Sequence, residues 1–303
     1  MELAENKFVV TGGSGFIGSH VVDQLLEARA DVVVFDAVVR RENLPAEHGR
    51  LEVIEGDVTD VSALRAAMEG AAGVFHLAVL PLGACIESPR RCVDVNVVGT
   101  FNVFEAAQAA GVRKVVFSSA SSVYGETSET MDESHPLEAE TMYGASKIAG
   151  EYFLRAFGDM YGLEHVVLRY MNVYGPRQEG GLVVNVLRRI LGGSPPVING
   201  DGSQSFDFVH VGDVAFANLR AMASDVSGEA FNVGSGEEVS VKEIVERLIV
   251  AADSDLEPEF TSERVLMARR VGSSEKAKRL LGWTASRDLD AGLRDVVGSL
   301  RAG

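Results

Sequence analysis

Between Lys7 and Tyr170, short runs of β-branched residues alternate with longer amphipathic stretches. Such runs are buried on both faces of a sheet, and the amphipathic stretches cover those faces, so this alternation predicts an α/β fold with a parallel sheet and helices on both sides. The expected strands are 8–11, 32–36, 51–55, 73–77, 115–119 and 165–170, and the expected helices are 15–28, 61–68, 93–110 and 142–161.

After residue 170 the pattern changes. Gly and Pro cluster at 175–176, 180–181, 192–196 and 200–202, and the expected strands become fewer and shorter. We therefore expect one domain over residues 1–171 and a smaller lobe made mainly by residues 172–303, with some segments able to return to the first domain.

Composition argues against several classes of function. The net charge of −16 and pI near 4.8 oppose attraction to nucleic acid or anionic membranes. Cys85 and Cys92 form no CxxC pair, and no His cluster has ligand spacing, so we expect no disulfide framework, no metal site and two buried apolar cysteines in a reduced cytoplasm. The start of the chain lacks a targeting pattern, and no apolar run approaches the roughly 20 residues of a membrane span.

A glycine-rich segment, TGGSGFIG at 11–18, follows the first expected strand and opens the first helix. Glycines there allow a tight turn and let backbone N–H groups approach a pyrophosphate. Asp36 ends the second strand 18 residues after Gly18, close to the spacing of a ribose-binding carboxylate. The pattern predicts a Rossmann-type site for NAD, since a carboxylate repels the extra phosphate of NADP, although Arg40 and Arg41 leave NADP open.

Tyr143 and Lys147 lie at positions i and i+4 of an expected helix, so both side chains project from one face. An ammonium group beside a phenol favours the phenolate, which predicts a lowered pKa for Tyr143 and a proton acceptor near neutral pH. This helix follows the serine-rich segment 118–125 and the dinucleotide-binding half. That position favours catalysis over a chance spacing.

Several motifs along the chain now form a recognisable series: TGGSGFIGSH at 11–20, GDV at 56–58, HLA at 76–78, NVVGT at 96–100, SSVYG at 121–125, YGASK at 143–147 and LRYMNVYGPRQ at 168–178. In this order they resemble the extended short-chain dehydrogenase/reductases, and specifically the NAD-dependent sugar-nucleotide epimerase/dehydratase group. The resemblance covers nearly the whole chain. It implies a Rossmann-type doubly wound parallel sheet with a smaller C-terminal substrate-binding lobe.

The resemblance also implies a role for each matching residue. For the cofactor, the pyrophosphate would lie on Gly12, Gly15, Phe16, Ile17 and Gly18, the ribose on Asp36, the adenine between Asp57 and Val58, and the nicotinamide end near Leu77, Ala78, Asn96, Ser118, Tyr143, Lys147 and Tyr170. Asn172 and Arg177 would contact the nucleotide-diphosphate sugar. Phe206 stands where relatives carry a phosphate-binding Arg, and Arg264, Arg269 and Arg270 are the candidate replacements.

One departure concerns the catalytic hydroxyl. Ala120 occupies the position of the family's usual Ser or Thr, so Ser122, which would share a side with Ala120 along an extended segment, or Ser121 is expected to replace it. The alternative is that both serines only satisfy backbone groups. Dehydratases of this group carry acidic residues at these two serine positions, so hydroxyls favour epimerisation.

The expected activity is therefore NAD-dependent C4 epimerisation of a UDP-sugar, of the UDP-glucose or UDP-glucuronate type, through a transient 4-keto sugar. Tyr143 and Lys147 would be catalytic, assisted by Ser122 or Ser121. A sugar-nucleotide 4,6-dehydratase, a uronate decarboxylase and, remotely, a non-catalytic NAD-binding scaffold remain alternatives. Apolar surface on helices 93–110 and 142–161, which relatives pair across an interface, predicts a homodimer.

Overall fold

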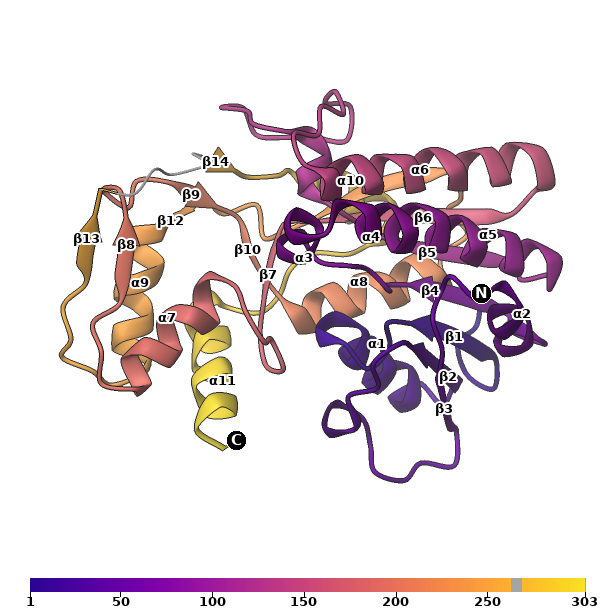
Figure 1. Cartoon of the computed structure of the whole chain (residues 1–303), viewed down its shortest axis with the longest axis horizontal. Helices are drawn as coiled ribbons and strands as arrows, with labels where there is room; N and C mark the ends of the chain where they lie inside the picture. Colours follow the sequence, from indigo (N-terminus) through magenta and orange to yellow (C-terminus); the bar gives the residue numbers. More distant parts are fainter. Residues whose placement is uncertain (263–268, 303) are drawn as a thin grey trace.

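A computed structural model describes residues 1–262 and 269–302, and its centre is a parallel sheet of seven strands (Figure 1). From one edge to the other the strands are β11 (Glu229–Val233), β6 (Glu164–Tyr170), β5 (Lys114–Ala120), β4 (Gly73–His76), β1 (Lys7–Thr11), β2 (Asp31–Asp36) and β3 (Leu51–Glu55). The chain thus builds the sheet from β1 outward to β3 at one edge, then returns to the centre and builds from β4 toward the other edge. This order is that of a doubly wound fold and confirms the expected fold class.

Successive residues of the central strands enter two different cores. In β1, Phe8 and Val10 belong to one buried cluster and Val9 to another, because side chains alternate across a strand. The first cluster lies under α1 (Phe16–Glu27) and α8 (Val211–Ala223). The second lies under α2 (Val61–Met68), α5 (Thr100–Ala109) and α6 (Met142–Tyr161).

Helix α6, which carries the expected catalytic pair, has well-defined ends. The Thr141 side chain accepts a hydrogen bond from the Gly144 amide at 3.0 Å, and Gly162 ends the helix with φ of +73°. The expected helix 93–110 is instead composite. It begins in α4 (Pro89–Val93), passes through a π-helical turn, η2 (Asp94–Gly99), and continues as α5.

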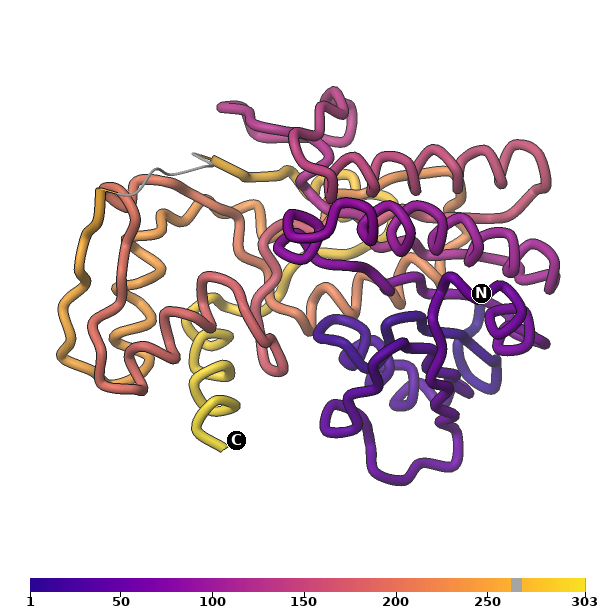
Figure 2. Tube along the Cα trace, in the orientation of Figure 1, coloured from indigo at the N-terminus to yellow at the C-terminus, as the bar shows by residue number. Residues whose placement is uncertain are grey.

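The second lobe has its own core, between α7 (Leu182–Leu191), α9 (Val241–Ala251) and α11 (Leu289–Ala302). After β6 the chain crosses into this lobe, returns through α8 and β11 to the large sheet, and crosses again (Figure 2). The short strands around the crossings are β7 (Asn172–Tyr174), β8 (Val197–Asn199), β9 (Ser205–Phe206), β10 (Phe208–His210), β12 (Val239–Ser240), β13 (Glu259–Thr261) and β14 (Arg269–Arg270). Helix α10 (Glu275–Leu281) then packs against β11. In the described part of the chain, no helix is long and apolar enough to cross a membrane.

Candidate active site

A cavity of about 580 Å³ opens at the carboxyl ends of the central strands, where ligands bind in doubly wound folds. Its walls come from the loop after β1, the ends of β2, β4 and β5, the start of α6 and the segment after β6. The lining includes most of the expected cofactor residues: Gly12, Gly15, Phe16, Ile17, Gly18, Asp36, Asp57, Val58, Leu77, Ala78, Ser118, Tyr143 and Tyr170.

The glycine-rich loop fits a dinucleotide phosphate. Gly12 has φ of +67°, and a Cβ there would lie 2.7 Å from the Ala78 nitrogen, so no larger residue fits. A Cβ on Gly18 would collide with the Gly12 carbonyl oxygen. Gly15 caps α1 without any side-chain bond to the helix, which leaves the first amides of α1 directed at the cavity.

Asp36 lies at the end of β2 and its carboxylate is anchored. Oδ2 accepts hydrogen bonds from the Ser14 hydroxyl at 2.7 Å and from the Ser14 amide at 3.1 Å. The Arg40 guanidinium is engaged elsewhere, by Glu179, with an Nε–Oε1 distance of 2.6 Å. With Arg40 held by a carboxylate and Asp36 facing the cavity, the site carries the charge pattern that suits a free ribose hydroxyl better than a phosphate.

Asn96 is not among the residues lining the cavity. It is buried in the π-helical turn, where its Oδ1 accepts from the Leu80 amide at 2.7 Å and its Nδ2 donates to the Leu80 carbonyl at 3.0 Å. Leu80 itself lines the cavity. Asn96 therefore positions a wall residue, a use that fits the frequent occurrence of π-helical turns at functional sites.

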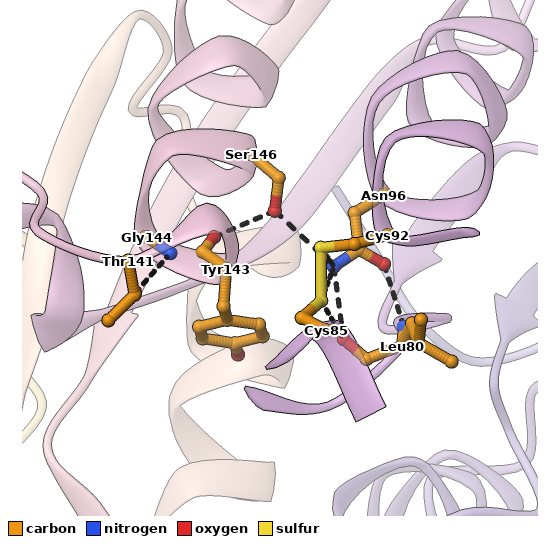
Figure 3. The surroundings of a disulfide bond; sticks show 8 residues. All are labelled: Leu80, Cys85, Cys92, Asn96, Thr141, Tyr143, Gly144 and Ser146. Atoms are coloured by element: carbon orange, nitrogen blue, oxygen red, sulfur yellow. Dashed lines mark hydrogen bonds between the residues drawn. A yellow bond between two sulfur atoms is a disulfide. The ribbon is translucent and has the colours of Figure 1, made fainter. Parts of the chain in front are cut away.

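The expectation that Cys85 and Cys92 remain unpaired is wrong. They form a disulfide between α3 (Leu82–Glu87) and α4, because the chain turns at Ser88 and brings the two short helices together. Both cysteines are fully buried, as expected. Figure 3 shows that Asn96 joins the disulfide to Ser146, whose hydroxyl donates to the Tyr143 carbonyl at 2.7 Å.

Tyr143 and Lys147 come together as their spacing predicts. Lys147 is buried, and its Nζ lies 5.7 Å from the centre of the Tyr143 ring. The same Nζ donates to the Ser118 carbonyl at 2.7 Å, which fixes the ammonium at the end of β5. The pair therefore lies at the carboxyl end of β5, and Tyr143 lines the same cavity as the glycine-rich loop.

The expected lowering of the Tyr143 pKa is not seen. Burial alone raises the pKa of the Tyr143 phenol to about 12. Burial also lowers the pKa of Lys147 to about 7, against an opposing pull from Glu151. The depth at which the Tyr143 phenol is buried therefore explains why its pKa is raised rather than lowered.

Tyr170 lines the cavity, and its hydroxyl is fixed from behind. It donates to Asn218 Oδ1 at 3.0 Å and accepts from Asn218 Nδ2 at 2.8 Å. Burial raises the Tyr170 pKa, so its phenol stays neutral and presents an aromatic wall rather than a charge.

The extended geometry expected for Ser121 and Ser122 is wrong. Strand β5 ends at Ala120, and the next four residues form a 3₁₀ turn, η3 (Ser121–Tyr124), so the alternation of a strand does not extend to Ser122. Ser122 packs beside the start of α6, since a Cβ on Gly144 would lie 2.6 Å from its carbonyl oxygen. The Ser122 hydroxyl is buried and has no partner among the described residues.

Of the expected substrate-binding residues that the structure describes, Arg177 lines the cavity, whereas Asn172 and Arg269 do not. Asn172 lies in β7 with a buried, unpartnered Nδ2, and Arg177 lines the cavity while its Nη1 donates to Asp23 at 2.7 Å. The Arg269 guanidinium is occupied by Glu238, at 2.8 Å, and by groups of the loop before α6. Arg264 falls outside the described residues.

A sequence profile of the NAD dependent epimerase/dehydratase family matches residues 8–234. The chain belongs to this family. The matched range includes both the glycine-rich loop and the Tyr143–Lys147 pair, and NAD is the family's cofactor.

Individual relatives agree with this assignment. A UDP-glucose 4-epimerase of Mycolicibacterium smegmatis is 38% identical over 306 residues, with 95% of this chain and 96% of the relative covered. The crystal structure of a Thermotoga maritima UDP-glucose 4-epimerase with UDP-glucose is 34% identical, with a TM-score of 0.93 and coverage of 98% and 99%. The structure of MoeE5 in complex with UDP-glucuronic acid and NAD is 32% identical, with a TM-score of 0.91 and the same coverage.

Within this family framework, one buried cluster was missed from the sequence. Glu151 accepts from Arg169 Nη2 at 2.6 Å and from the Ser119 hydroxyl at 2.5 Å, and Tyr124 extends the network to Asn232. Glu151 follows Lys147 by one helical turn, so the i, i+4 rule that found the catalytic pair could also have indicated a buried carboxylate. No pattern in the sequence indicates its partners, which come from other elements.

Proposed function

We propose that this protein catalyses C4 epimerisation of a UDP-sugar through a transient 4-keto sugar. The observation that carries the proposal is the placement of the Tyr143 phenol in the wall of the same cavity as the glycine-rich loop. The serines at 121 and 122 support it, because no carboxylate stands there to eliminate water. The related epimerases that bind UDP-glucose support UDP as the nucleotide.

Tyr143 removes the proton from the sugar O4 and returns it after the sugar has turned over in the site. NAD would supply reversible hydride exchange at C4, which lets the configuration there invert. Gly12, Gly15, Phe16, Ile17 and Gly18 would hold its pyrophosphate, and Asp36 would hold its ribose. The Ser122 or Ser121 hydroxyl shares the O4 proton, and Asn172 and Arg177 hold the sugar nucleotide.

Lys147 sets the protonation state of the pair. With a pKa of about 12 Tyr143 is protonated at neutral pH, so it needs a neighbouring positive charge to act as a base. Lys147 is that charge within the protein, and its link to the Ser118 carbonyl keeps it in place. We expect its charged form to be the active one, and the coupled pair to titrate together.

The test is to incubate the purified protein with UDP-glucose, UDP-galactose and UDP-glucuronate and to identify the products by NMR. Epimerisation gives a product of unchanged composition with inverted C4. Loss of water identifies a dehydratase, and a UDP-pentose with carbon dioxide identifies a decarboxylase. Bound NAD with no conversion of any sugar identifies a scaffold.

We further propose a homodimer built on α5 and α6. These helices lie side by side on one flank of the molecule (Figure 1), and their outer faces expose Phe101, Tyr152, Met160 and Tyr161. Apolar surface of this kind favours self-association. Light scattering should report a dimer for the natural chain and a monomer for Tyr152→Glu.

The proposed compartment is the cytoplasm. Cytosolic proteins rarely keep disulfides, so Cys85 and Cys92 are expected as thiols while the protein is in that compartment and as a disulfide after oxidation. Mass spectrometry of denatured protein, isolated with and without an alkylating agent, distinguishes the two states, because only free thiols gain the alkyl group. A disulfide present in both preparations argues against a reduced compartment.

A further inference from the structure

Arg91 is an exposed arginine in the last turn of α4, and it lines the cavity. Two other described arginines, Arg40 and Arg177, line the same cavity. A carboxylate holds each of those two, since Arg40 pairs with Glu179 at 2.6 Å and Arg177 with Asp23 at 2.7 Å. Across residues 1–262 and 269–302, no ion pair or hydrogen bond engages the side chain of Arg91. Its charge is therefore available to a ligand.

The helix that carries Arg91 is tied to the segment that follows β4. Cys92, the next residue, is the single buried side chain of α4, and it forms the disulfide with Cys85 of α3. Four residues further on, Asn96 bonds to both the amide and the carbonyl of Leu80, which lines the cavity (Figure 3). These links hold α4, and with it Arg91, against one wall of the cavity.

That wall adjoins the glycine-rich loop. Ala78, which lines the cavity two residues before Leu80, lies so close to Gly12 that a Cβ on the glycine would be 2.7 Å from the Ala78 nitrogen. The amides at the start of α1, which the glycine-rich loop leads into, can receive a phosphate in this part of the cavity. Arg91 thus shares a wall with the place where a phosphate would lie.

The charges of the wall make a free guanidinium important to an anionic ligand. Asp36, Asp57 and Glu179 line the cavity, and the whole chain carries a net charge of −16, so the surroundings oppose the entry of an anion. A diphosphate brings a negative charge on each of its phosphates. Among the described arginines of the wall, Arg91 is the one whose charge is not already neutralised by a carboxylate.

We propose that Arg91 binds a diphosphate group in this cavity and supplies the charge that neutral backbone amides lack. The planar fork of a guanidinium matches the oxygens of a phosphate, which it can hold with two parallel hydrogen bonds. NAD and a sugar nucleotide both contain a diphosphate, so either could occupy Arg91. The NAD case stands by itself, whereas the sugar-nucleotide case rests on the proposed function.

The test is calorimetric titration of the cofactor-free protein with ADP and NAD, and of the NAD-loaded protein with UDP and UDP-glucose. We compare the natural chain with Arg91→Met and with a matched control, Arg90→Met. Arg90 is the exposed neighbour on the same helix, with the same charge, and it does not line the cavity.

Arg91→Met should weaken the binding of one pair of ligands about 5- to 50-fold, the size of a charge-assisted hydrogen bond at a partly solvated site. Arg90→Met should change the affinity for none of the four. Arg91→Lys keeps the charge without the fork, so its affinity should lie between those of the natural chain and Arg91→Met.

The pair of ligands affected identifies the source of the diphosphate. A loss confined to ADP and NAD places Arg91 on the cofactor, and a loss confined to UDP and UDP-glucose places it on the substrate. A loss for all four with Arg90→Met unaffected places it beside both, and each of these results supports the proposal.

No loss for any ligand in Arg91→Met would overturn the proposal. So would equal losses in Arg91→Met and Arg90→Met, because they would show only the long-range field of a positive charge. Binding is measured apart from turnover. If UDP-glucose binds through Arg91 but is not converted, the proposed function therefore fails while this inference stands.

Discussion

Helix α6 buries charge in two opposite ways, one turn apart. Lys147 lies between Tyr143 and the Ser118 carbonyl, and within the described part of the chain no carboxylate lies within 4.0 Å of it. Glu151, on the next turn, accepts hydrogen bonds from both Arg169 and Ser119. Tyr143, beside Lys147, lines the cavity, whereas Glu151 belongs to the buried network with Arg169 and Ser119.

The difference between Lys147 and Glu151 distinguishes a reactive site from a structural ion pair. In a satisfied ion pair each charge neutralises the other, and stability is lost when one partner is removed. An unpaired buried lysine keeps a shifted pKa and remains able to respond to a ligand, which is why such groups mark functional sites. By this criterion Tyr143 and Lys147 are poised for chemistry, whereas Glu151 and Arg169 hold β5 and β6 to the helix.

The largest expected effect is on catalysis at Tyr143. Tyr143→Phe should lower kcat by about 10²–10⁴, since it removes a general acid–base group and little volume. Binding of NAD and of the sugar nucleotide should change little. Steady-state kinetics with the substrate identified by NMR, together with calorimetry, measures both.

Tyr124→Phe is the matched control for that change. It deletes the same hydroxyl inside the scaffold, where Tyr124 donates to Asn232 and accepts from Arg169. We expect a loss of about 1–3 kcal/mol in unfolding free energy from the partners left unsatisfied, with kcat retained. A Tyr124→Phe variant as inactive as Tyr143→Phe would remove the distinction between the two regions.

The next effect is on stability at the scaffold. Glu151→Gln leaves Arg169 buried without a counter-charge, and we expect it to lower the unfolding free energy by about 3–5 kcal/mol in urea titrations. Asp159→Asn removes a carboxylate from the same helix, but its pair with Arg155 is exposed and 3.8 Å long, so its effect should be small. Similar losses for both variants would show that the buried pair has no special role.

The sequence predicted the scaffold better than the chemistry. The six expected strands and the bounds of α2 and α6 are confirmed, because branched runs, a Thr cap at 141 and a Gly stop at 162 act locally. The disulfide was missed, since pairing Cys85 with Cys92 depends on how two short helices fold back at Ser88. The Tyr143 pKa was predicted in the wrong direction, because the depth of burial is a property of the assembled fold.

Position 122 shows the same limit at the site itself. A Ser-Ser-Val sequence suits either an extended segment or a turn, and the choice is made by packing against Gly144 of α6. The buried Nε of Arg270 has no hydrogen-bond partner among the described residues. This too depends on contacts between distant segments, at Gly125 and β14. Local patterns identify candidate residues, whereas tertiary contacts decide their state.

A smaller effect is expected on the stability of the protein when Lys147 is replaced. Burial lowers the Lys147 pKa from 10.5 to about 7, so between these pH values the unfolded chain binds one more proton at this residue than the folded chain does. The burial penalty is therefore full below pH 7 and vanishes as the pH approaches 10.5. Lys147→Met should be inactive yet more stable at pH 7 by roughly 2–4 kcal/mol, with the gain shrinking as the pH rises.

Urea titrations of the cofactor-free protein at pH 7, 8.5 and 10 measure this trend. The stability difference between Lys147→Met and the natural chain should fall at each step. A constant difference would mean that Lys147 stays charged in the folded protein, and that its pKa is not lowered by burial.

The smallest expected effect is at Ser122, and it tests which hydroxyl serves Tyr143. The Ser122 Oγ is buried without a partner, so Ser122→Ala should leave stability unchanged while lowering kcat about 2- to 10-fold, the value of one neutral hydrogen bond to the sugar O4. Ser119→Ala, whose hydroxyl bonds to Glu151, should do the reverse and cost stability without affecting kcat. Ala120 lines the cavity, so Ala120→Ser in the Ser122→Ala background should restore the rate by supplying the family's usual hydroxyl. An unchanged kcat in Ser122→Ala would transfer the role to Ser121 or to Tyr143 acting alone.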